Sequence, residues 1–516
     1  MPIFQQGAIN TTALVVPDYY VQIVSPQNLL LNGVPTNIVG VVGSAQWGPV
    51  NTATIVGSMA DYTRNFGAVQ ARKFDAGTAV AIAVQQGANN FRVVRVTDTT
   101  DVAATSAGVS TCITFTAAYT GSLGNSLSAA LATGSKASSW KFTVGLPGQQ
   151  PEVFDNITGT GNAFWVNLAA AINSGNSVSR GPSQLITATA AAGTTAATAA
   201  TFTFASGTDG ATSVTSTQMV GTDGTARTAM YALRGTGCSI GMLADLDDST
   251  KWSAIDSFGL SEGIYMVQVV PAGTAIASAI TSKTSAGLDS YSSKLMHGDW
   301  IWWSDQVNAV TRLVSPQGFV AGRLANLSPE QSSLNKPLYG VIGSQKSGLV
   351  GSQQLQTYSS ADLQTLFTAG IDVISNPQPG GSFWGVRCGH NSSSNSGTNG
   401  DNYTRMTNYI ASTLNAGMGK YVGQVVNSAL FQRIRATLMT FLANLQQQGL
   451  LGTTDGSLPY SVVCDTSNNP GTRTGLGYVQ ADVQVRYQAI NEKFIVNVEG
   501  GQTVQVLRQQ TLPVAA

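Results

Sequence analysis

The sequence predicts a mixed α/β protein of several domains. At 516 residues the chain exceeds one ordinary core, and roughly three or four domains are expected from its length. Strand-like and helix-like segments alternate before residue 99 and again after residue 228, which is typical of a mixed or parallel sheet covered by helices. Between these parts the composition shifts to Ala, Thr, Ser and Gly with short β-like runs, which indicates an inserted β-rich domain.

The first 25 residues are predicted to be an extended arm. The β-rich run at 19–24, which contains Tyr20, Val21 and Ile23, is bracketed by Pro17 and Pro26 and has no evident partner nearby. An edge strand of the chain's own domain is the alternative.

An α/β part is expected over residues 26–98. The run NIVGVVG (37–43) has the pattern of a buried strand, residues 76–86 favour a helix, and FRVVRV (91–96) favours a second strand. Gly87 suits the end of the helix.

Residues 99–228 are expected to form the inserted β domain, exposed at the surface. Short β-like runs occur at 139–144 and 200–204, and GTDG occurs at 207–210 and 221–224. Asp-Gly pairs favour tight turns. The carboxylates around them are too sparse for a calcium cage of six or more oxygens.

The α/β alternation returns in residues 229–390. Strands are predicted at 264–270, 300–303 and 371–375, and helices at 274–285, 318–326 and 360–369.

The C-terminal domain, residues 401–500, is predicted to contain two long helices followed by strands. The helices span 401–418 and about 427–448. Alternation of apolar and polar residues predicts a strand at 479–487, and Phe494, Val496 and Val498 repeat the pattern at 494–498. Residues 501–516 then form a second arm that includes Val504 and Val506. One stripe of the second helix is apolar: Phe431, Ile434, Leu438, Leu442 and Leu445.

The charge of the chain is low and balanced. Charged residues make up 10% of the chain, with 26 basic and 26 acidic residues, against about 25% in typical soluble domains. So few charged residues indicate that much of the surface meets other protein; a hardy extracellular particle would also fit. Zero net charge argues against a nucleic-acid binder. No apolar run approaches a membrane span, and the start MPIFQQGAIN does not resemble a secretory signal, so synthesis and retention in a cytoplasm are expected.

No catalytic, cofactor or metal site is predicted. His297, in HGDW, lacks a GxSxG serine context for a hydrolase, and GMGK (417–420) fails the phosphate-loop pattern. The aspartates of LADLDDS (243–249) miss the EF-hand spacing. The four cysteines are far apart in sequence and are expected to be buried free thiols.

Several motifs, taken in order, resemble the tail sheath proteins of contractile bacteriophages. They cover nearly the whole chain except about residues 130–225, and their order and spacing carry the resemblance. They are NIVGVVGSAQWGPVNTATIVGSMADYTRNFG, NNFRVVRV, YTGSLGNSL, PQGFVAGRLA followed by NKP, IDVISNPQPGG and TRMTNYIASTLNAG.

The resemblance implies a non-enzymatic subunit that stacks in rings around a tail tube and shortens to drive the tube through a host envelope for genome ejection. It implies contacts with the tube, baseplate and tail terminator proteins, assembly in a host cytoplasm, a place in the virion, and no nucleic-acid or membrane partner. It also implies a subtilisin-like middle domain, here without a catalytic triad.

Two sets of residues are assigned to assembly. Segments 14–24 and 502–510 are predicted to pair with strands of neighbouring subunits, because backbone hydrogen bonds survive rigid-body rotation. The helix at 427–448 is predicted to face the tube, where basic side chains would meet acidic groups; a plain solvated face is the alternative. The residues are Val15, Tyr20, Val21, Ile23, Val504 and Val506 for strand exchange, and Lys420, Arg433 and Arg435 for the tube.

Two other readings stay open from the sequence. A phage-like bacteriocin or secretion device would use the same kind of subunit. A tail fibre or adhesin is suggested by the Thr/Ala/Gly-rich insert, although no trimeric β-helical repeat is found.

Overall fold

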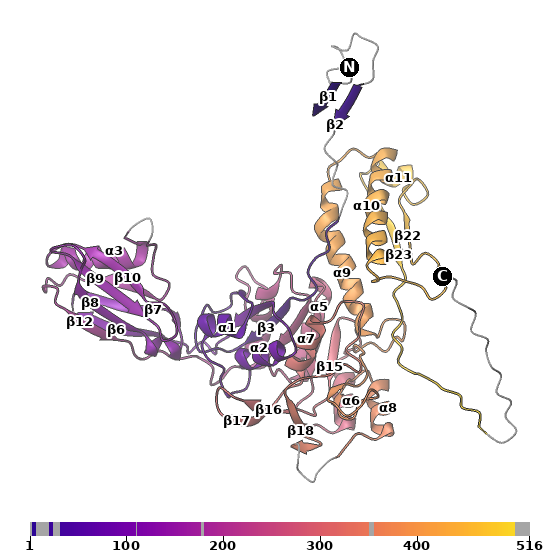
Figure 1. The fold of residues 1–516 in the computed structure, drawn as a ribbon, viewed down its shortest axis with the longest axis horizontal. Coiled ribbons are helices and arrows are strands. Elements are labelled where there is room, and N and C mark those ends of the chain that lie inside the picture. The colour runs from indigo at the N-terminus through magenta and orange to yellow at the C-terminus, as the bar shows by residue number, and fades with distance from the viewer. Residues whose placement is uncertain are drawn as a thin grey trace, which may run out of the picture.

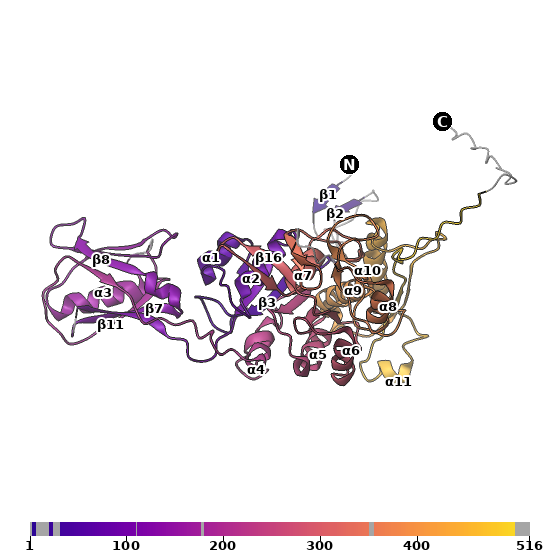
Figure 2. The ribbon, with the colours of Figure 1, turned by 90° about the horizontal axis from the view of Figure 1, so that it is seen from below.

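The computed structural model describes residues 3–6, 20–23, 31–109, 111–176, 180–349 and 356–500. Three regions follow one another along the long axis (Figure 1). A β-rich insert lies at one end, an α/β body occupies the centre, and a pair of long helices stands at the other side. Figure 2 shows the same succession from below.

A six-stranded sheet in the order β15-β14-β13-β3-β5-β4 forms the centre of the body. All neighbours are parallel except β4, which pairs antiparallel to β5. Parallel strands are usually buried on both faces, and those of β3, β13, β14 and β15 are buried at every position. The strands span Val39–Gly43 (β3), Thr54–Val56 (β4), Phe91–Arg95 (β5), Ile240–Leu243 (β13), Tyr265–Val269 (β14) and Ser293–Met296 (β15).

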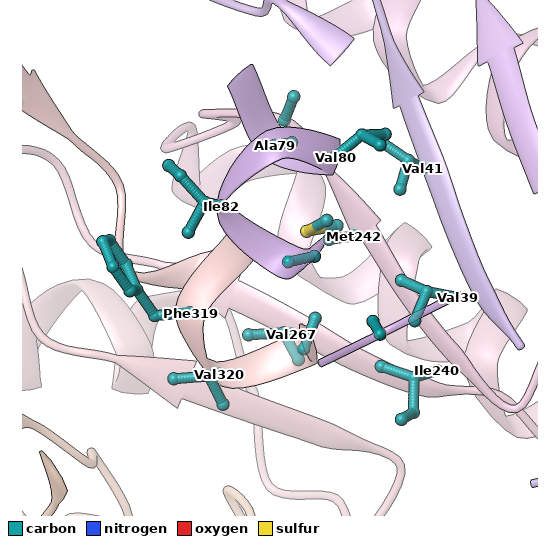
Figure 3. Close-up of a cluster of buried hydrophobic side chains, with 14 of the residues drawn as sticks. Val39, Val41, Ala79, Val80, Ile82, Ile240, Met242, Val267, Phe319 and Val320 are labelled. Atoms are coloured by element: carbon teal, nitrogen blue, oxygen red, sulfur yellow. The ribbon is translucent and has the colours of Figure 1, made fainter. Parts of the chain in front are cut away.

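Helices α2 (Ala76–Gln85) and α7 (Gln317–Ala325) pack on one face of this sheet. Val80 of α2 lies beside Val41 of β3 there, and Phe319 and Val320 of α7 belong to the same buried cluster (Figure 3). The two helices approach closely because Gly322 has no side chain: a Cβ at that position would lie 2.5 Å from the Cα of Ala83. The opposite face is covered by α5 (Trp252–Glu262) and by α4 (Ser216–Val220).

Smaller elements complete the body. A four-stranded sheet has the order β17-β16-β18-β19, and β20 pairs with β21. These elements are α1 (Met59–Phe66), α6 (Ile276–Ser285), β16 (Ile301–Asp305), β17 (Val310–Val314), β18 (Val341–Ser344), β19 (Gly348–Leu349), α8 (Ser360–Thr368), β20 (Ile374–Ser375) and β21 (Gly385–Val386).

The insert consists of two antiparallel sheets and one helix around its own core. Phe115 and Phe142 from the two sheets stack against each other at 4.9 Å between ring centroids. One sheet has β6 (Ala103–Val109), β7 (Ile113–Thr120) and β11 (Ile186–Ala190). The other has β8 (Ser128–Thr133), β9 (Trp140–Gly145), β10 (Glu152–Ile157) and β12 (Ala200–Thr203), and α3 spans Asn162–Ser174.

The C-terminal part is a helical hairpin, α9 (Asp401–Met418) and α10 (Ser428–Gln447). Strands β22 (Tyr460–Val463) and β23 (Asp482–Val485) pair antiparallel beside it, and α11 spans Gly471–Thr474. The predicted apolar stripe of α10 is buried as expected.

The mixed α/β, multi-domain class predicted from the sequence is confirmed. Several details differ. Residues 494–498 form no strand, and the strands predicted at 479–487 and 371–375 shorten to β23 and β20. Alternation of side chains was a misleading signal at 494–498, because a strand also needs a partner and the described residues supply none there. In addition, α4 packs on the body although it precedes the predicted boundary at residue 228. All four cysteines are free and buried, as expected.

Candidate assembly surfaces and the junctions behind them

The segment 31–36 is a strap that runs along helix α9. Leu31 is buried beside Gly417, where an added Cβ would lie 2.2 Å from its side chain. The Val34 N–H donates to the Thr413 hydroxyl at 3.2 Å, and Arg405 donates to the Thr36 carbonyl at 3.4 Å. The strap is thus antiparallel to α9, and its first residue, Leu31, lies near the C-terminal end of this helix.

The predicted N-terminal strand residues fall in β2 (Tyr20–Ile23), which pairs in parallel with β1 (Ile3–Gln6). The register places Tyr20 opposite Ile3. Among the described residues, these two strands pair only with each other. Val15 lies outside the described residues.

The C-terminal segment leaves the body beyond Lys493. Before that point it is held by two contacts: Asn402 donates to the Gln488 carbonyl at 2.9 Å, and His390 Nε2 lies 2.6 Å from Glu492 Oε1. After it, the apolar side chains become exposed: Phe494 by 82%, Ile495 by 80%, Val496 by 63% and Val498 by 86%. Val504 and Val506 lie outside the described residues.

The two segments leave α9 from opposite ends. The strap begins beside Gly417, near the end of α9, whereas Gln488 is bound at Asn402, near its start. The helix has 18 residues, which corresponds to about 27 Å at 1.5 Å per residue.

The exposed charge of the helical hairpin is basic. Lys420, Arg433 and Arg435 are all exposed, and the sequence has no acidic residue from 402 to 454. The structure therefore places the three predicted residues on one hairpin. Arg435 also interacts electrostatically with Asp465. The pKa of Asp465 is lowered mainly by hydrogen bonds from Ser467 and to a smaller extent by this arginine.

A buried ionic cluster joins α9 to the body. Lys294 on β15 lies 2.7 Å from Asp372 and 3.0 Å from Asp401, the first residue of α9, and all three side chains are at most 1% exposed. The hydroxyls of Tyr265 and Ser333 also donate to Asp401. Burial opposes the ionisation of Asp401, but Lys294 and these hydrogen bonds outweigh it, so its pKa is lowered.

Sequence reasoning missed this cluster and the strap. The signal for the cluster is Lys294 in the run SKLM, a strand that is buried at every position. A lysine is almost never fully buried without a partner. Nothing in the sequence indicates which carboxylates would meet it.

His297 is placed as a buried structural residue. Burial lowers the pKa of His297 to about 4, followed by the smaller effect of Lys346. Its neighbour Asp299 instead accepts from Ser344 and Tyr358. Among the described residues, His297 Nδ1 has no hydrogen-bond partner, so no Ser/His/Asp arrangement is assembled.

The other discounted motifs have local roles. Residues 419–421 form a 3-10 turn between α9 and α10. Asp245 approaches the Ser315 N–H, Asp247 pairs with Lys73, and Asp248 bonds Thr250. These three aspartates have separate partners, and the described ranges contain no cluster of His, Cys, Asp or Glu able to hold a metal ion. Nor does any described helix have the length and apolar character needed to cross a membrane.

Comparison with known proteins gives matches by structure. No family model matches the sequence, and no curated protein matches it. A sheath tail protein from Listeria innocua is similar with a TM-score of 0.60 at 15% identity, over 85% of this chain and 90% of that one. A sheath tail protein from Desulfitobacterium hafniense gives 0.57 at 13%, over 86% and 93%. The sheath of an extracellular contractile injection system, solved in its contracted state, gives 0.55 at 12%, over 95% and 99%. The chain thus has the fold of sheath proteins from contractile tails and injection systems, as its motifs predicted.

Proposed function

We propose that this chain is the structural subunit of a contractile sheath that polymerises around a tail tube and shortens to drive the tube through an envelope. The observation that carries the proposal is the fold likeness, which extends over nine tenths or more of each of the three sheath proteins.

The proposed assembly uses strand donation. Among the described residues, β22 and β23 pair only with each other, so this two-stranded sheet has two open edges beside α10. An open edge accepts an added strand through backbone hydrogen bonds. The exposed, largely apolar run at 494–498 has the character of such a strand. Val15, Tyr20, Val21 and Ile23 at one end and Val504 and Val506 at the other remain the proposed exchanging positions.

The proposed tube contact is the basic face of the hairpin, with Lys420, Arg433 and Arg435 against acidic groups of the tube protein. Long-range attraction of this kind mainly favours encounter and register. Baseplate and tail terminator proteins would bind the two ends of the polymer. The work would come from two packings of the lattice that differ by a few kcal/mol per subunit, so the subunit needs neither catalysis nor a cofactor.

The particle is proposed to be a virion with a contractile tail, assembled in the host cytoplasm and used for genome ejection. A phage-like bacteriocin or an injection system is the second candidate, because one similar structure belongs to an injection system. A capsid gene beside the coding gene would favour the virion.

Electron microscopy of the purified chain tests the sheath proposal. The full chain is expected to form hollow cylinders or long helical polymers in negative stain. Deletion of residues 1–24 is expected to abolish the polymers while the circular dichroism and thermal midpoint of the fold are kept. Persistent monomers of the full chain at high concentration would argue against the sheath, and normal polymers of the deletion variant would refute the N-terminal arm.

A further inference from the structure

The root of the insert contains a concentration of buried polar atoms without partners. Arg95, at the end of β5, donates to the carbonyls of Gly48 at 2.8 Å, Thr120 at 2.6 Å and Asp209 at 3.0 Å. Arg72 donates to the Asp209 carboxylate at 2.7 Å, and this carboxylate also accepts from Ser122. Gly48 belongs to the body, whereas Thr120 ends β7 and Asp209 follows β12 of the insert, so this group joins the two.

Six atoms of this group are buried and lack a hydrogen-bond partner among the described residues. Tyr62, Asp75 and Arg95 are all 0% exposed. These atoms are Tyr62 Oη, Arg72 Nε, Arg72 Nη2, Asp75 Oδ1, Arg95 Nε and Thr120 Oγ1. Native proteins rarely leave buried polar atoms unsatisfied, and so many in one group point to a shared ligand.

The distances suit a small bridging molecule. Arg72 Nε lies 3.7 Å from Asp75 Oδ1, which is too long for a direct hydrogen bond but suitable for one molecule that contacts both. Tyr62 Oη and Asp75 Oδ2 lie 3.0 and 3.1 Å from the point that a Cβ on Gly77 would occupy. A glycine at position 77 therefore keeps room between α1 and the start of α2.

The chemistry favours a neutral ligand. Two arginines, Arg72 and Arg95, face two aspartates, Asp75 and Asp209, so the formal charges cancel without an added ion. The unpartnered atoms include both donors and an acceptor. A buried water molecule typically makes about three hydrogen bonds and can satisfy both kinds.

We propose that the root of the insert encloses bound water, held by Tyr62 Oη, Asp75 Oδ1 and the Nε atoms of Arg72 and Arg95. The water accepts from the guanidinium groups and donates to the carboxylate, so it completes the junction between the insert and the body. This site is independent of the sheath proposal, because it depends only on the fold of one subunit.

A structure of the full chain at a resolution that shows ordered solvent tests the site directly. The expected result is a peak within hydrogen-bond distance of at least three of the named atoms. No peak there would overturn the proposal, and so would an ion, identified by anomalous signal from crystals soaked in bromide.

Stability of a conservative variant gives a second test. Tyr62→Phe removes only the hydroxyl, and it is expected to lower the thermal midpoint because the water loses a partner. In a dry site the same change would leave the midpoint unchanged or raise it, since an unpaired buried hydroxyl would be removed; that result would overturn the proposal. Tyr265→Phe is the matched control, because the Tyr265 hydroxyl is equally buried and is directly bonded to Asp401 at 2.5 Å.

Discussion

Replacement of Lys294 by methionine is predicted to loosen the attachment of α9 to the body. Methionine keeps most of the side-chain volume but removes the ammonium group between Asp372 and Asp401. Both carboxylates are at most 1% exposed. They would then be buried without their shared counter-charge, which is strongly unfavourable.

The expected loss is about 3–5 kcal/mol, the usual effect of breaking a buried ion pair by removing one partner. Lys73→Met is the matched control. Lys73 pairs with Asp247 at 2.9 Å, close to the Lys294 distances, but its side chain is 51% exposed, and exposed pairs contribute about 0–1 kcal/mol. The comparison varies burial while residue type and pair distance stay nearly fixed.

Hydrogen exchange of the α9 amides is a suitable assay, because a chain of several domains need not unfold in one step. A loss of 3 kcal/mol corresponds to a fall in protection of roughly 100-fold or more. Adding Asp401→Asn to Lys294→Met should restore part of the protection. If Lys294→Met lowers protection no more than Lys73→Met does, the proposed role of the buried cluster is refuted.

Two further predictions concern pH and charge. Because the pKa of His297 is lowered to about 4 from an unfolded value of about 6.5, the unfolded chain binds the extra proton between these values, and stability should fall as pH drops through this window. His297 should lower the free energy of unfolding by about 2 kcal/mol at pH 5 relative to neutral pH. Urea denaturation of the native chain and of His297→Asn at both pH values measures this loss. Equal losses of unfolding free energy in the two proteins would contradict the prediction. The double variant Arg433→Glu/Arg435→Glu should form sheaths poorly on isolated tubes at low salt, while the thermal midpoint of the chain is retained. Lys141→Glu in the insert is the control. Unaffected sheath formation by the double variant would show that these arginines do not contact the tube.

The chain combines firmly bonded and exposed parts. The strap and the ionic cluster fix α9 to the body through contacts at several points of the helix, whereas the chain beyond Lys493 exposes its apolar side chains. The proposed sheath would use this combination, because a lattice that rearranges without separating needs firm bodies and extended connections.

Regular elements were predictable where local pattern and tertiary packing agree. The helix at 401–418 was placed at its observed bounds, and the α10 stripe was identified by its helical period. At 494–498 the local pattern predicted a strand that the described chain does not form. A strand is completed only by its neighbour, and no residue of the described chain pairs with this segment.

By itself, the sequence determined the succession of regions and the low and balanced charge. It also determined that all charged residues from 402 to 454 are basic. Only the tertiary structure decided that the strap lies on α9, that Lys294 meets Asp372 and Asp401, and that Arg95 joins the insert to the body. Periodicity reports which face of an element is buried. It carries no information on which distant residue meets that face, because the choice of partner depends on how separate elements pack together.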